Sequence, residues 1–273
     1  MHKLSKKDIT QLLKPRKASS HKGTYGHGLL IAGSLGKMGA AVIAAKACMR
    51  SGIGLLTVNV PEEERFILQT AIPEAMLMLR EEVKLSFNNF SAIAIGPGLG
   101  TNDKAKKILQ KVLQAKKPLV LDADALNIIS INKKLLQAIP PNSILTPHPK
   151  EFDRLFGNHN SNEERIKTAI AKAKQLNLII VLKGHQTLIT YAGKSFCNTT
   201  GNAGLAKGGS GDALTGIITA FLAQGYEPPN AAILAVYMHG LASDITLQTQ
   251  SMESMLISDV IENIGAAFKS LAK

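Results

Sequence analysis

The sequence predicts a single three-layer α/β domain, in which a central, mostly parallel sheet carries helices on both faces. Short apolar runs alternate with longer helical patterns along most of the 273 residues, an order typical of parallel sheets. Hydrophobic residues make up 45% of the chain, which is enough for a sizeable core. Because neither an internal repeat nor a linker-like stretch divides the sequence, we expect residues 1–273 to form one domain.

The predicted strands are short runs of aliphatic residues. In chain order they are His27–Ala32, Leu55–Val60, Ala75–Leu79, Ala92–Ile95, Leu119–Leu121, Ser143–Leu145 and Ile179–Leu182. Their continuous apolar character is typical of strands that are buried on both faces of a parallel sheet. Thr187–Tyr191 and Ser195–Thr199 flank Gly193, and this pattern predicts an antiparallel hairpin.

The predicted helices show apolar residues at helical spacing. Ser5, with Asp8 three residues later, indicates a capped amphipathic helix near the N-terminus. Asp122 and Asp124 fit the caps of a short helix over Ala125–Ser130. The other helices are expected at Lys37–Arg50, Glu62–Ala71, Asn102–Ala115, Asn162–Asn177, Asp212–Gln224, Asn230–Leu247 and Ser258–Leu271.

The positive charge of the chain is concentrated in two segments. The formal net charge is +12, and residues 1–22 and 104–117 hold the whole excess of lysine and arginine. In the second segment Ile108, Leu109 and Val112 occupy the opposite face of the predicted helix, so we interpret the lysines as a solvated face. A nucleic-acid surface should also bring a recognition motif or aromatic side chains for stacking. No recognition motif is present and aromatic residues make up only 4% of the chain, so we expect no nucleic-acid partner.

Three absences narrow the class of protein further. No apolar run reaches the length of about 18 residues that spans a bilayer, so we expect no membrane partner. Cys48 and Cys197 lie far apart and match no metal-binding spacing, so no zinc site is expected. The N-terminus has no apolar signal core, and we therefore expect a cytoplasmic protein.

Glycine and polar residues gather where the predicted strands end. They form five loops, over residues 33–40, 96–100, 122–127, 146–151 and 183–187. Because the carboxyl ends of parallel strands meet at one edge of a sheet, we expect these loops to converge on one ligand site. Neither glycine-rich loop is a familiar nucleotide motif. Gly33–Lys37 is too short for a P-loop, and Gly96–Gly100 lacks the GxGxxG spacing.

The most distinctive segment is GLAKGGSGD, residues 204–212, which leads into an apolar helix. Glycines before a helix leave backbone N–H groups free to converge on an anion, and the helix N-terminus adds partial positive charge. The segment therefore predicts a phosphate cradle, in which Asp212 can accept a proton from a substrate hydroxyl. A simple helix cap is the alternative role of Asp212, and these residues alone leave both roles open.

Six motifs in a fixed order give the chain a family resemblance. They are GSLGKMGAA, GPGLG, LDADALN, LTPHPKE, LKGHQT and NAGLAKGGSGDALTGIITAFLAQG. GGSGD at the start of a late helix resembles the ribokinase-like superfamily, and the six motifs are similar to those of the ADP/ATP-dependent NAD(P)H-hydrate dehydratases. The resemblance extends from about Gly26 to Asp244. It implies a ribokinase-like fold and the repair of hydrated NADH or NADPH: ADP or ATP, with Mg²⁺, phosphorylates the ring hydroxyl, and loss of phosphate restores the dihydropyridine.

The resemblance also implies roles for individual residues. Asp212 is the expected base, beside an anion hole made of Gly208, Gly209, Ser210 and Gly211. The adenine nucleotide is expected to contact Lys183, Gly184, His185, Gln186, Thr187 and Gly211. The hydrated dinucleotide is expected to contact Ala40, Gly98, Gly100, His148 and Asp212. Glu151 is expected to organise Mg²⁺ through water.

Other roles and functions remain open at this point. Ala40 also suits helix packing, His148 a structural position between two prolines, and Lys183 an exposed strand end. A small-molecule kinase of the same superfamily, such as one for a vitamin precursor, would use the same Asp212 and anion hole. A nucleotide sensor without catalysis would not need the Asp212 carboxylate.

Beyond the site, the resemblance implies a homo-oligomer, with a tetramer as the expected state. Because the chain begins essentially at the dehydratase motifs, we expect no epimerase domain and a functional pairing with a separate epimerase.

Overall fold

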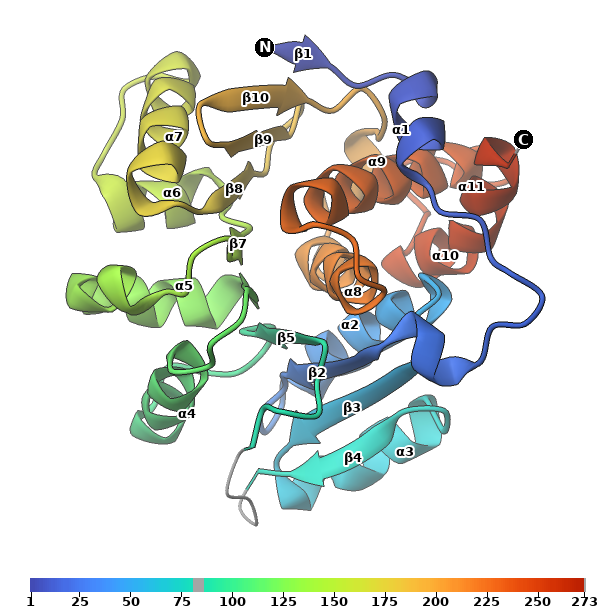
Figure 1. Ribbon diagram of the computed structural model, residues 1–273, viewed down its shortest axis with the longest axis horizontal. Coiled ribbons are helices and arrows are strands. Elements are labelled where there is room, and N and C mark those ends of the chain that lie inside the picture. The colour runs from blue at the N-terminus through green and yellow to red at the C-terminus, as the bar shows by residue number, and fades with distance from the viewer. Residues whose placement is uncertain (81–85, 273) are drawn as a thin grey trace.

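A sheet of ten strands runs through the part of the chain that this computed structural model describes, residues 1–80 and 86–272 (Figure 1). In chain order the strands are β1 (His2–Lys3), β2 (His27–Ile31), β3 (Leu55–Val60), β4 (Met76–Leu79), β5 (Ala92–Ile95), β6 (Leu119–Leu121), β7 (Ile144–Leu145), β8 (Ile179–Leu182), β9 (Leu188–Tyr191) and β10 (Lys194–Cys197). Their spatial order is β1-β10-β9-β8-β7-β6-β5-β2-β3-β4. In this spatial order, the neighbouring strands from β8 to β4 pair in parallel, and so do β1 and β10. Strand β9 is antiparallel to both β8 and β10. The mostly parallel sheet and its hairpin are confirmed.

Helices cover both faces of this sheet (Figure 1). One face carries α1 (Lys6–Leu12), α2 (Met38–Arg50), α3 (Arg65–Ala71), α8 (Ser210–Ala223), α9 (Pro228–Thr246), α10 (Ile257–Glu262) and α11 (Ile264–Leu271). The other face carries α4 (Asp103–Leu113), α5 (Ala123–Ile131), α6 (Pro149–Phe156) and α7 (Asn162–Leu176). The three-layer prediction is confirmed. None of the helices in residues 1–80 and 86–272 combines the length and the apolar character needed to cross a bilayer.

Alternate residues of the strands serve two separate cores. In β2, Leu30 packs with α2 and α8 on one side of the sheet, whereas Leu29 and Ile31 face α4 and α5 on the other. The contact between α2 and α8 is especially close, since a Cβ on Gly216 would lie only 2.0 Å from the carbonyl oxygen of Ala44. Helix α8 also lies against β2, β5 and β6, and its N-terminus reaches the carboxyl edge of the sheet.

Three of the differences from the prediction have an identifiable physical reason. The segment 62–71 begins as a 3-10 helix (Glu62–Glu64) before α3. The last predicted helix is divided at Asn263, whose side-chain amide donates to the Asp259 carbonyl at 3.0 Å and to Thr246 Oγ1 at 3.1 Å. Helix α6 was not predicted, because the prolines on both sides of His148 are typical of a loop.

The two basic segments have different surroundings. On α4, Ile108 and Val112 are buried while Lys104, Lys107 and Lys111 are exposed, so the predicted solvated face is confirmed for this helix. Lys117, which follows the helix, is partly buried and donates to the carbonyls of Phe87 and Phe90, so the prediction is wrong for this lysine.

In the N-terminal segment, two of the cations lie against aromatic rings instead. Lys14 Nζ is 4.6 Å from the ring centroid of Tyr226, and the Arg16 guanidinium carbon is 3.8 Å from that of Tyr25. These residues line a cavity of about 1310 Å³ beside the start of β2 and the ends of α2 and α8. Lys14 and Arg16 remain exposed while they make these contacts.

The strand order reverses at β2. From β2 the sheet continues to β3 and β4 on one side, and to β5, β6, β7 and β8 on the other. Such a switch point opens a crevice beyond the carboxyl ends of the two strands that meet there. The glycine-rich loops after β2 and β5 border this crevice, as the sequence predicts.

Candidate active site

The N-terminus of α8 forms an open glycine-rich turn. Gly209 is the N-cap residue with φ +93°, and a Cβ there would lie 2.7 Å from Ile43 Cδ1, so only glycine fits. The helix begins without a side-chain cap hydrogen bond, and the N–H groups of a first helical turn have no partner within the helix. Gly208 has open space on its side-chain face. Residues Gly208–Gly211 thus have the form of an anion-binding turn.

Lys183 places a cation directly beside this turn. Its Nζ lies 3.1 Å from the position of a Cβ on Gly211 and 2.9 Å from Asp122 Oδ1. Burial lowers the pKa of Lys183, but the carboxylates of Asp122 and Glu151 outweigh burial, and the pKa is raised overall. The side chain is 21% exposed. Lys183 is therefore a charged member of the site, and the alternative of an exposed strand-end charge is wrong.

Asp122 holds Lys183 in place. It is the N-cap residue of α5, but its side chain makes no cap hydrogen bond. Asp122 is 1% exposed. Its other carboxylate oxygen, Oδ2, accepts a hydrogen bond from Thr215 Oγ1 of α8 at 2.8 Å. The predicted capping role of the Asp122 side chain is therefore wrong: its two oxygens join β8 to α8 instead.

Asp212 lies in the first turn of α8, next to these charges. Burial raises the pKa of its carboxyl to about 6, the charge of Asp122 adds to this rise, and Lys183 opposes it. A carboxyl group with a pKa near 6 is mostly ionised at neutral pH and is basic enough to accept a proton. The N-cap of α8 is Gly209, so the alternative that Asp212 is the cap does not apply.

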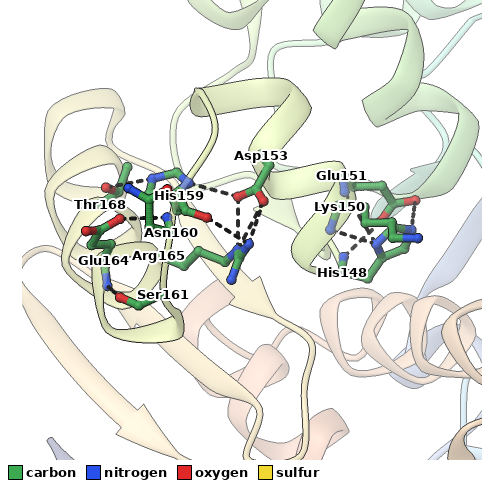
Figure 2. Close-up of polar contacts among 10 residues, drawn as sticks. All are labelled: His148, Lys150, Glu151, Asp153, His159, Asn160, Ser161, Glu164, Arg165 and Thr168. Atoms are coloured by element: carbon green, nitrogen blue, oxygen red, sulfur yellow. Dashed lines mark hydrogen bonds and ion pairs between the residues drawn. The ribbon is translucent and has the colours of Figure 1, made fainter.

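His148 begins α6 and lines the same corner. Its Nδ1 accepts hydrogen bonds from the backbone N–H groups of Lys150 and Glu151 at 3.1 and 3.3 Å. The Glu151 carboxylate accepts from the His148 N–H at 2.8 Å, which completes a reciprocal cap (Figure 2). The His148 side chain stays 44% exposed, and burial holds the pKa of the ring below its usual value. His148 therefore has a structural role and also presents a ring to the cavity.

A second polar cluster fixes α6 against α7 (Figure 2). Asp153 of α6 accepts hydrogen bonds from the Arg165 guanidinium, the shorter at 2.7 Å, and lies 2.8 Å from His159 Nδ1. The other ring nitrogen of His159 is 2.9 Å from Thr168 Oγ1. Paired contacts between arginine and a carboxylate define orientation as well as distance. The cluster thus positions the start of α6, and His148 with it.

A cavity of about 600 Å³ opens beside the N-terminus of α8, within the usual size range of small-molecule sites. It is lined by residues predicted for the nucleotide and the anion hole, with His148: Lys183, Gly184, His185, Thr187, Ser210, Gly211 and His148. Gln186 makes a different contact, 3.5 Å from Cys197 Sγ to its Oε1. The structure therefore brings the predicted nucleotide residues together, with Gln186 turned to β10.

The far wall of this cavity was missed by sequence reasoning. It consists of Asn198, Thr200, Gly201, Asn202, Leu205, Val236, His239 and Gly240. Two sequence signals could have indicated it. The polar run NTTGN ends one residue before the glycine-rich segment, and His239 is a lone histidine in the apolar helix α9.

The residues predicted for the dinucleotide lie mainly outside the lining of this cavity. A Cβ on Gly98 would be 3.0 Å from the Cβ of Ala40, so these two positions adjoin. The backbone N–H of Gly100 donates to Asp124 Oδ2 at 2.8 Å. Because Asp124 also raises the pKa of Asp212, this loop pair lies within electrostatic reach of the carboxylate. His148 is placed differently, in the lining of the nucleotide-side cavity.

The described residues do not form a metal site of their own. In residues 1–80 and 86–272 no group of three His, Cys, Asp or Glu side chains is arranged to hold a metal ion. Glu151 is 6% exposed, and one of its oxygens accepts from the His148 N–H and lies 3.9 Å from Lys183 Nζ. One carboxylate oxygen is thus engaged by protein groups, and the expected role of Glu151 in organising Mg²⁺ through water stays a prediction.

Comparison with known proteins identifies the family. A model described as NAD(P)H-hydrate dehydratase matches residues 28–265. The chain belongs to the NAD(P)H-hydrate dehydratase family. It is 37% identical over 272 residues to the ADP-dependent (S)-NAD(P)H-hydrate dehydratase of Bacillus subtilis, with 96% of each chain covered. It also spans about half the length, 52%, of bifunctional NAD(P)H-hydrate repair enzymes that it matches.

Solved structures of relatives agree with the fold of this dehydratase-family chain. The ADP/ATP-dependent NAD(P)H-hydrate dehydratase from Bacillus subtilis, co-crystallized with ATP/Mg²⁺, has a TM-score of 0.88 at 34% identity and covers 98% of both chains. A ribokinase-like superfamily protein from Enterococcus faecalis has a TM-score of 0.90 at 33% identity, covering 99% of this chain and 96% of that one. The predicted ribokinase-like fold and the family resemblance are therefore confirmed.

Proposed function

We propose that this protein is an ADP- or ATP-dependent dehydratase that restores NADH or NADPH from the hydrated (S) form. The observation that carries the proposal is the N-terminus of α8, where Asp212, Lys183 and the glycine turn meet beside a nucleotide-sized cavity. The relative at 37% identity is named for this reaction. With ADP the products are AMP and phosphate, and with ATP they are ADP and phosphate.

The first step transfers a phosphoryl group to the substrate. The hydroxyl oxygen on the hydrated ring attacks the terminal phosphorus of the nucleotide, and Asp212 accepts the hydroxyl proton. The bond from phosphorus to the bridging oxygen breaks, and its electron pair stays on the departing nucleotide. The backbone N–H groups of Gly208–Gly211 and the Lys183 ammonium stabilise the negative charge on the phosphoryl oxygens.

The second step expels phosphate from the ring. The lone pair of the ring nitrogen drives the adjacent C–O bond to break, and phosphate leaves with that electron pair. The neighbouring ring carbon then releases a proton, which re-forms the conjugated dihydropyridine. The task of the protein here is positioning, which we assign to His148, Ala40 and the backbone of Gly98 and Gly100.

We propose that Mg²⁺ reaches the site as part of the nucleotide substrate. Mg²⁺ is commonly held by substrate phosphates and water with few protein ligands, and the described residues provide no metal cluster of their own. The structural relative from Bacillus subtilis was co-crystallized with ATP and Mg²⁺ together.

One incubation tests the proposed reaction. The protein is mixed with Mg²⁺, ADP and the (S) hydrate of NADH, and the reduced-nicotinamide absorbance, AMP and phosphate are measured. We expect the three products in equal amounts, with no phosphorylated organic product. A stable phosphate ester of a small alcohol such as a vitamin precursor, with no action on either hydrate, would assign the protein to the superfamily's kinases instead.

We propose that the protein works as a homo-oligomer, with a tetramer as the expected state. Phe66 and Ile67 of α3 and Met76 of the edge strand β4 are large apolar side chains that are 63%, 45% and 42% exposed. Contact with a second copy would remove this apolar surface from water. Light scattering on the purified protein tests the assignment, and a monomer at micromolar concentration would contradict it.

We also place the reaction in the cytoplasm, with a separate epimerase as functional partner. Cys48 and Cys197 are both free and buried, as is usual for a reducing compartment. Because the relative is named for the (S) hydrate, the (R) hydrate should be converted only after an epimerase is added.

A further inference from the structure

The carboxylate of Asp212 has no protein partner, although a cation lies close to it. In residues 1–80 and 86–272 this carboxylate takes part in no hydrogen bond and no ion pair. Lys183 Nζ lies only 3.1 Å from the position of a Cβ on Gly211, the residue before Asp212. The charge of Asp212 also contributes to the raised pKa of Lys183. Because a lysine side chain is flexible and attracted to carboxylates, the absence of this ion pair requires a physical cause.

Asp122 offers Lys183 a different carboxylate, which is fixed and buried. Its Oδ1 lies 2.9 Å from Lys183 Nζ, and its Oδ2 accepts a hydrogen bond from Thr215 Oγ1 at 2.8 Å. The backbone N–H of Lys183 donates to the Pro147 carbonyl at 2.9 Å, so the base of the lysine side chain is also held. Asp122 is 1% exposed, and opposite charges attract more strongly where little water surrounds them. Both ends of the Lys183 side chain are therefore fixed beside α8 without a contact to Asp212.

The other charges around Asp212 do not provide a second cation. Asp122, Lys183, Asp124 and Glu151 are the charges that act most strongly on the pKa of Asp212, and only Lys183 lowers it. Of the elements packed against α8, β2 and α9 carry His27 and His239, whose pKa values are lowered by burial. The charged side chains of α2, α9 and α10 are Lys46, Arg50, Asp244, Asp259 and Glu262. The state of the base therefore depends mainly on where the Lys183 ammonium lies.

We propose that Asp122 is a positioning residue that keeps the Lys183 ammonium away from Asp212, so that the base stays free for the substrate hydroxyl and the ammonium stays beside the glycine turn for phosphate. The inference rests on the proposed function in that Asp212 serves as the base. Without the charge of Asp122, the ammonium would turn to Asp212 as the nearest free carboxylate. An opposite charge at this range lowers the pKa of a carboxyl group by about one to three units and makes it a weaker base.

The first test measures the Asp212 carboxyl group directly. Its ¹³C NMR signal, assigned by its loss in Asp212→Asn, is titrated in wild type and in Asp122→Asn, which keeps the side-chain shape and removes the charge. We expect a pKa of about 6 in wild type and a value at least roughly one unit lower in the variant. A crystal structure of the variant should show an ion pair between Lys183 and Asp212. An unchanged pKa, or a Lys183 that stays beside position 122, would overturn the proposal.

The second test uses the pH dependence of turnover with Mg²⁺, ADP and the (S) hydrate of NADH. In wild type, kcat should fall as the pH drops through about 6, because a protonated Asp212 cannot accept the hydroxyl proton. In Asp122→Asn this fall should move to lower pH by at least roughly one unit, and kcat at neutral pH should be about tenfold lower or less. A merely structural role of Asp122 would lower kcat without moving the fall, and that result would contradict the proposal.

Asp103→Asn is the matched control. Asp103 Oδ1 lies 2.9 Å from Lys106 Nζ, the same distance as in the pair of Asp122 and Lys183, but the Asp103 side chain is 87% exposed. Removing this solvated carboxylate should leave both the titration of Asp212 and the pH dependence of kcat unchanged.

The wild type provides a test that does not depend on the folding of Asp122→Asn. An Asp212 carboxyl that titrates below its ordinary value of 3.8 would show that Lys183 already pairs with it, and this would overturn the proposal. A value well above 3.8 supports it. If wild type converts neither hydrate, the proposed function fails, while the titration and the structure of the variant still test the arrangement of charges.

Discussion

At the scale of single residues, the site places opposite charges where little water reaches them. Asp122, at 1% exposure, bonds Lys183 on one oxygen and Thr215 on the other. Removing one partner of a buried pair commonly costs about 3–5 kcal/mol, because the other charge is left unpaired. The pair therefore holds the Lys183 ammonium beside Gly211, ready for a phosphate, without further movement of the chain.

The first prediction concerns the base. Asp212→Asn keeps the shape of the side chain and removes its capacity to accept a proton. We expect turnover to fall by roughly two to four powers of ten. Nucleotide affinity should be largely kept, because the glycine turn and Lys183 are unchanged. Single-turnover assays and calorimetry on the same preparation check both parts, and turnover within about tenfold of wild type would remove Asp212 from the mechanism.

The second prediction concerns how ionisation of the same carboxyl group changes the free energy of unfolding with pH. Its folded-state pKa is about 6 against an ordinary value of 3.8, mainly because of burial. Stability from the neutral form is therefore fully present below about pH 3.8 and is lost as pH rises through about 6. The Asp212→Asn variant has no carboxyl group to ionise at this position. As the pH rises from 4 to 7, its free energy of unfolding should therefore increase by roughly 2–3 kcal/mol relative to that of wild type. Urea titrations of both proteins across this range measure the difference, and a constant difference would contradict the raised pKa.

The sequence predicted the residues of the α8 turn better than their partners. Gly209 and Asp212 stand in one contiguous motif, so their proximity follows from local spacing. Asp122 meets Lys183 and Thr215 across 61 and 93 residues of sequence, and only the order of strands in the sheet brings them together. His239 was missed for the same reason, since its helix reaches the cavity only through tertiary packing.

At the scale of elements, the position of the site depends on how closely α2 and α8 approach. The third prediction tests this contact with a single methyl group. Gly216→Ala would place its Cβ 2.0 Å from the Ala44 carbonyl oxygen, which is backbone and cannot move aside alone. We expect destabilisation of about 1–3 kcal/mol, the usual result of overpacking, although alanine favours helices more than glycine does.

Gly265→Ala is the matched control for this contact. Gly265 is also helical, in α11, but a Cβ there meets nothing within 4 Å. We expect this substitution to be neutral or to stabilise by up to about 1 kcal/mol. Thermal and urea unfolding should therefore show Gly216→Ala destabilised and Gly265→Ala unchanged or stabilised, and a stabilised Gly216→Ala would contradict the close packing described here.

Elements were predictable where their pattern was local and periodic. The bounds of β3, β5, β6 and β8 agree with those expected from apolar runs. Helix α6 was not predicted because its N-cap residue is a histidine. Sequence rules for helix caps are based on Ser, Thr, Asp and Asn and do not include an imidazole. The break between α10 and α11 depends on hydrogen bonds from Asn263, one of them to Thr246 in another helix, and periodicity cannot reveal such a contact.

At the scale of the whole molecule, the sheet order decides which loops become neighbours. The alternation of strands and helices predicted parallel strands with their ends at one edge, and the structure confirms both. The reversal at β2 was not predictable from that alternation, because helix-linked strands can be added on either side of a sheet. It is this reversal that places the glycine-rich loops after β2 and β5 beside each other.

The last prediction concerns the net charge of +12. On α4 the exposed Lys104, Lys107 and Lys111 lie opposite a buried apolar face, and exposed charges are screened beyond about 8 Å at physiological salt. Reversing all three to Glu should therefore leave turnover and nucleotide affinity within a few-fold of wild type. The parent protein should also show no steep dependence of duplex DNA binding on salt, since that dependence arises when a protein neutralises many phosphates. Strong, salt-sensitive DNA affinity in the parent, abolished in the triple variant, would show instead that this face binds nucleic acid.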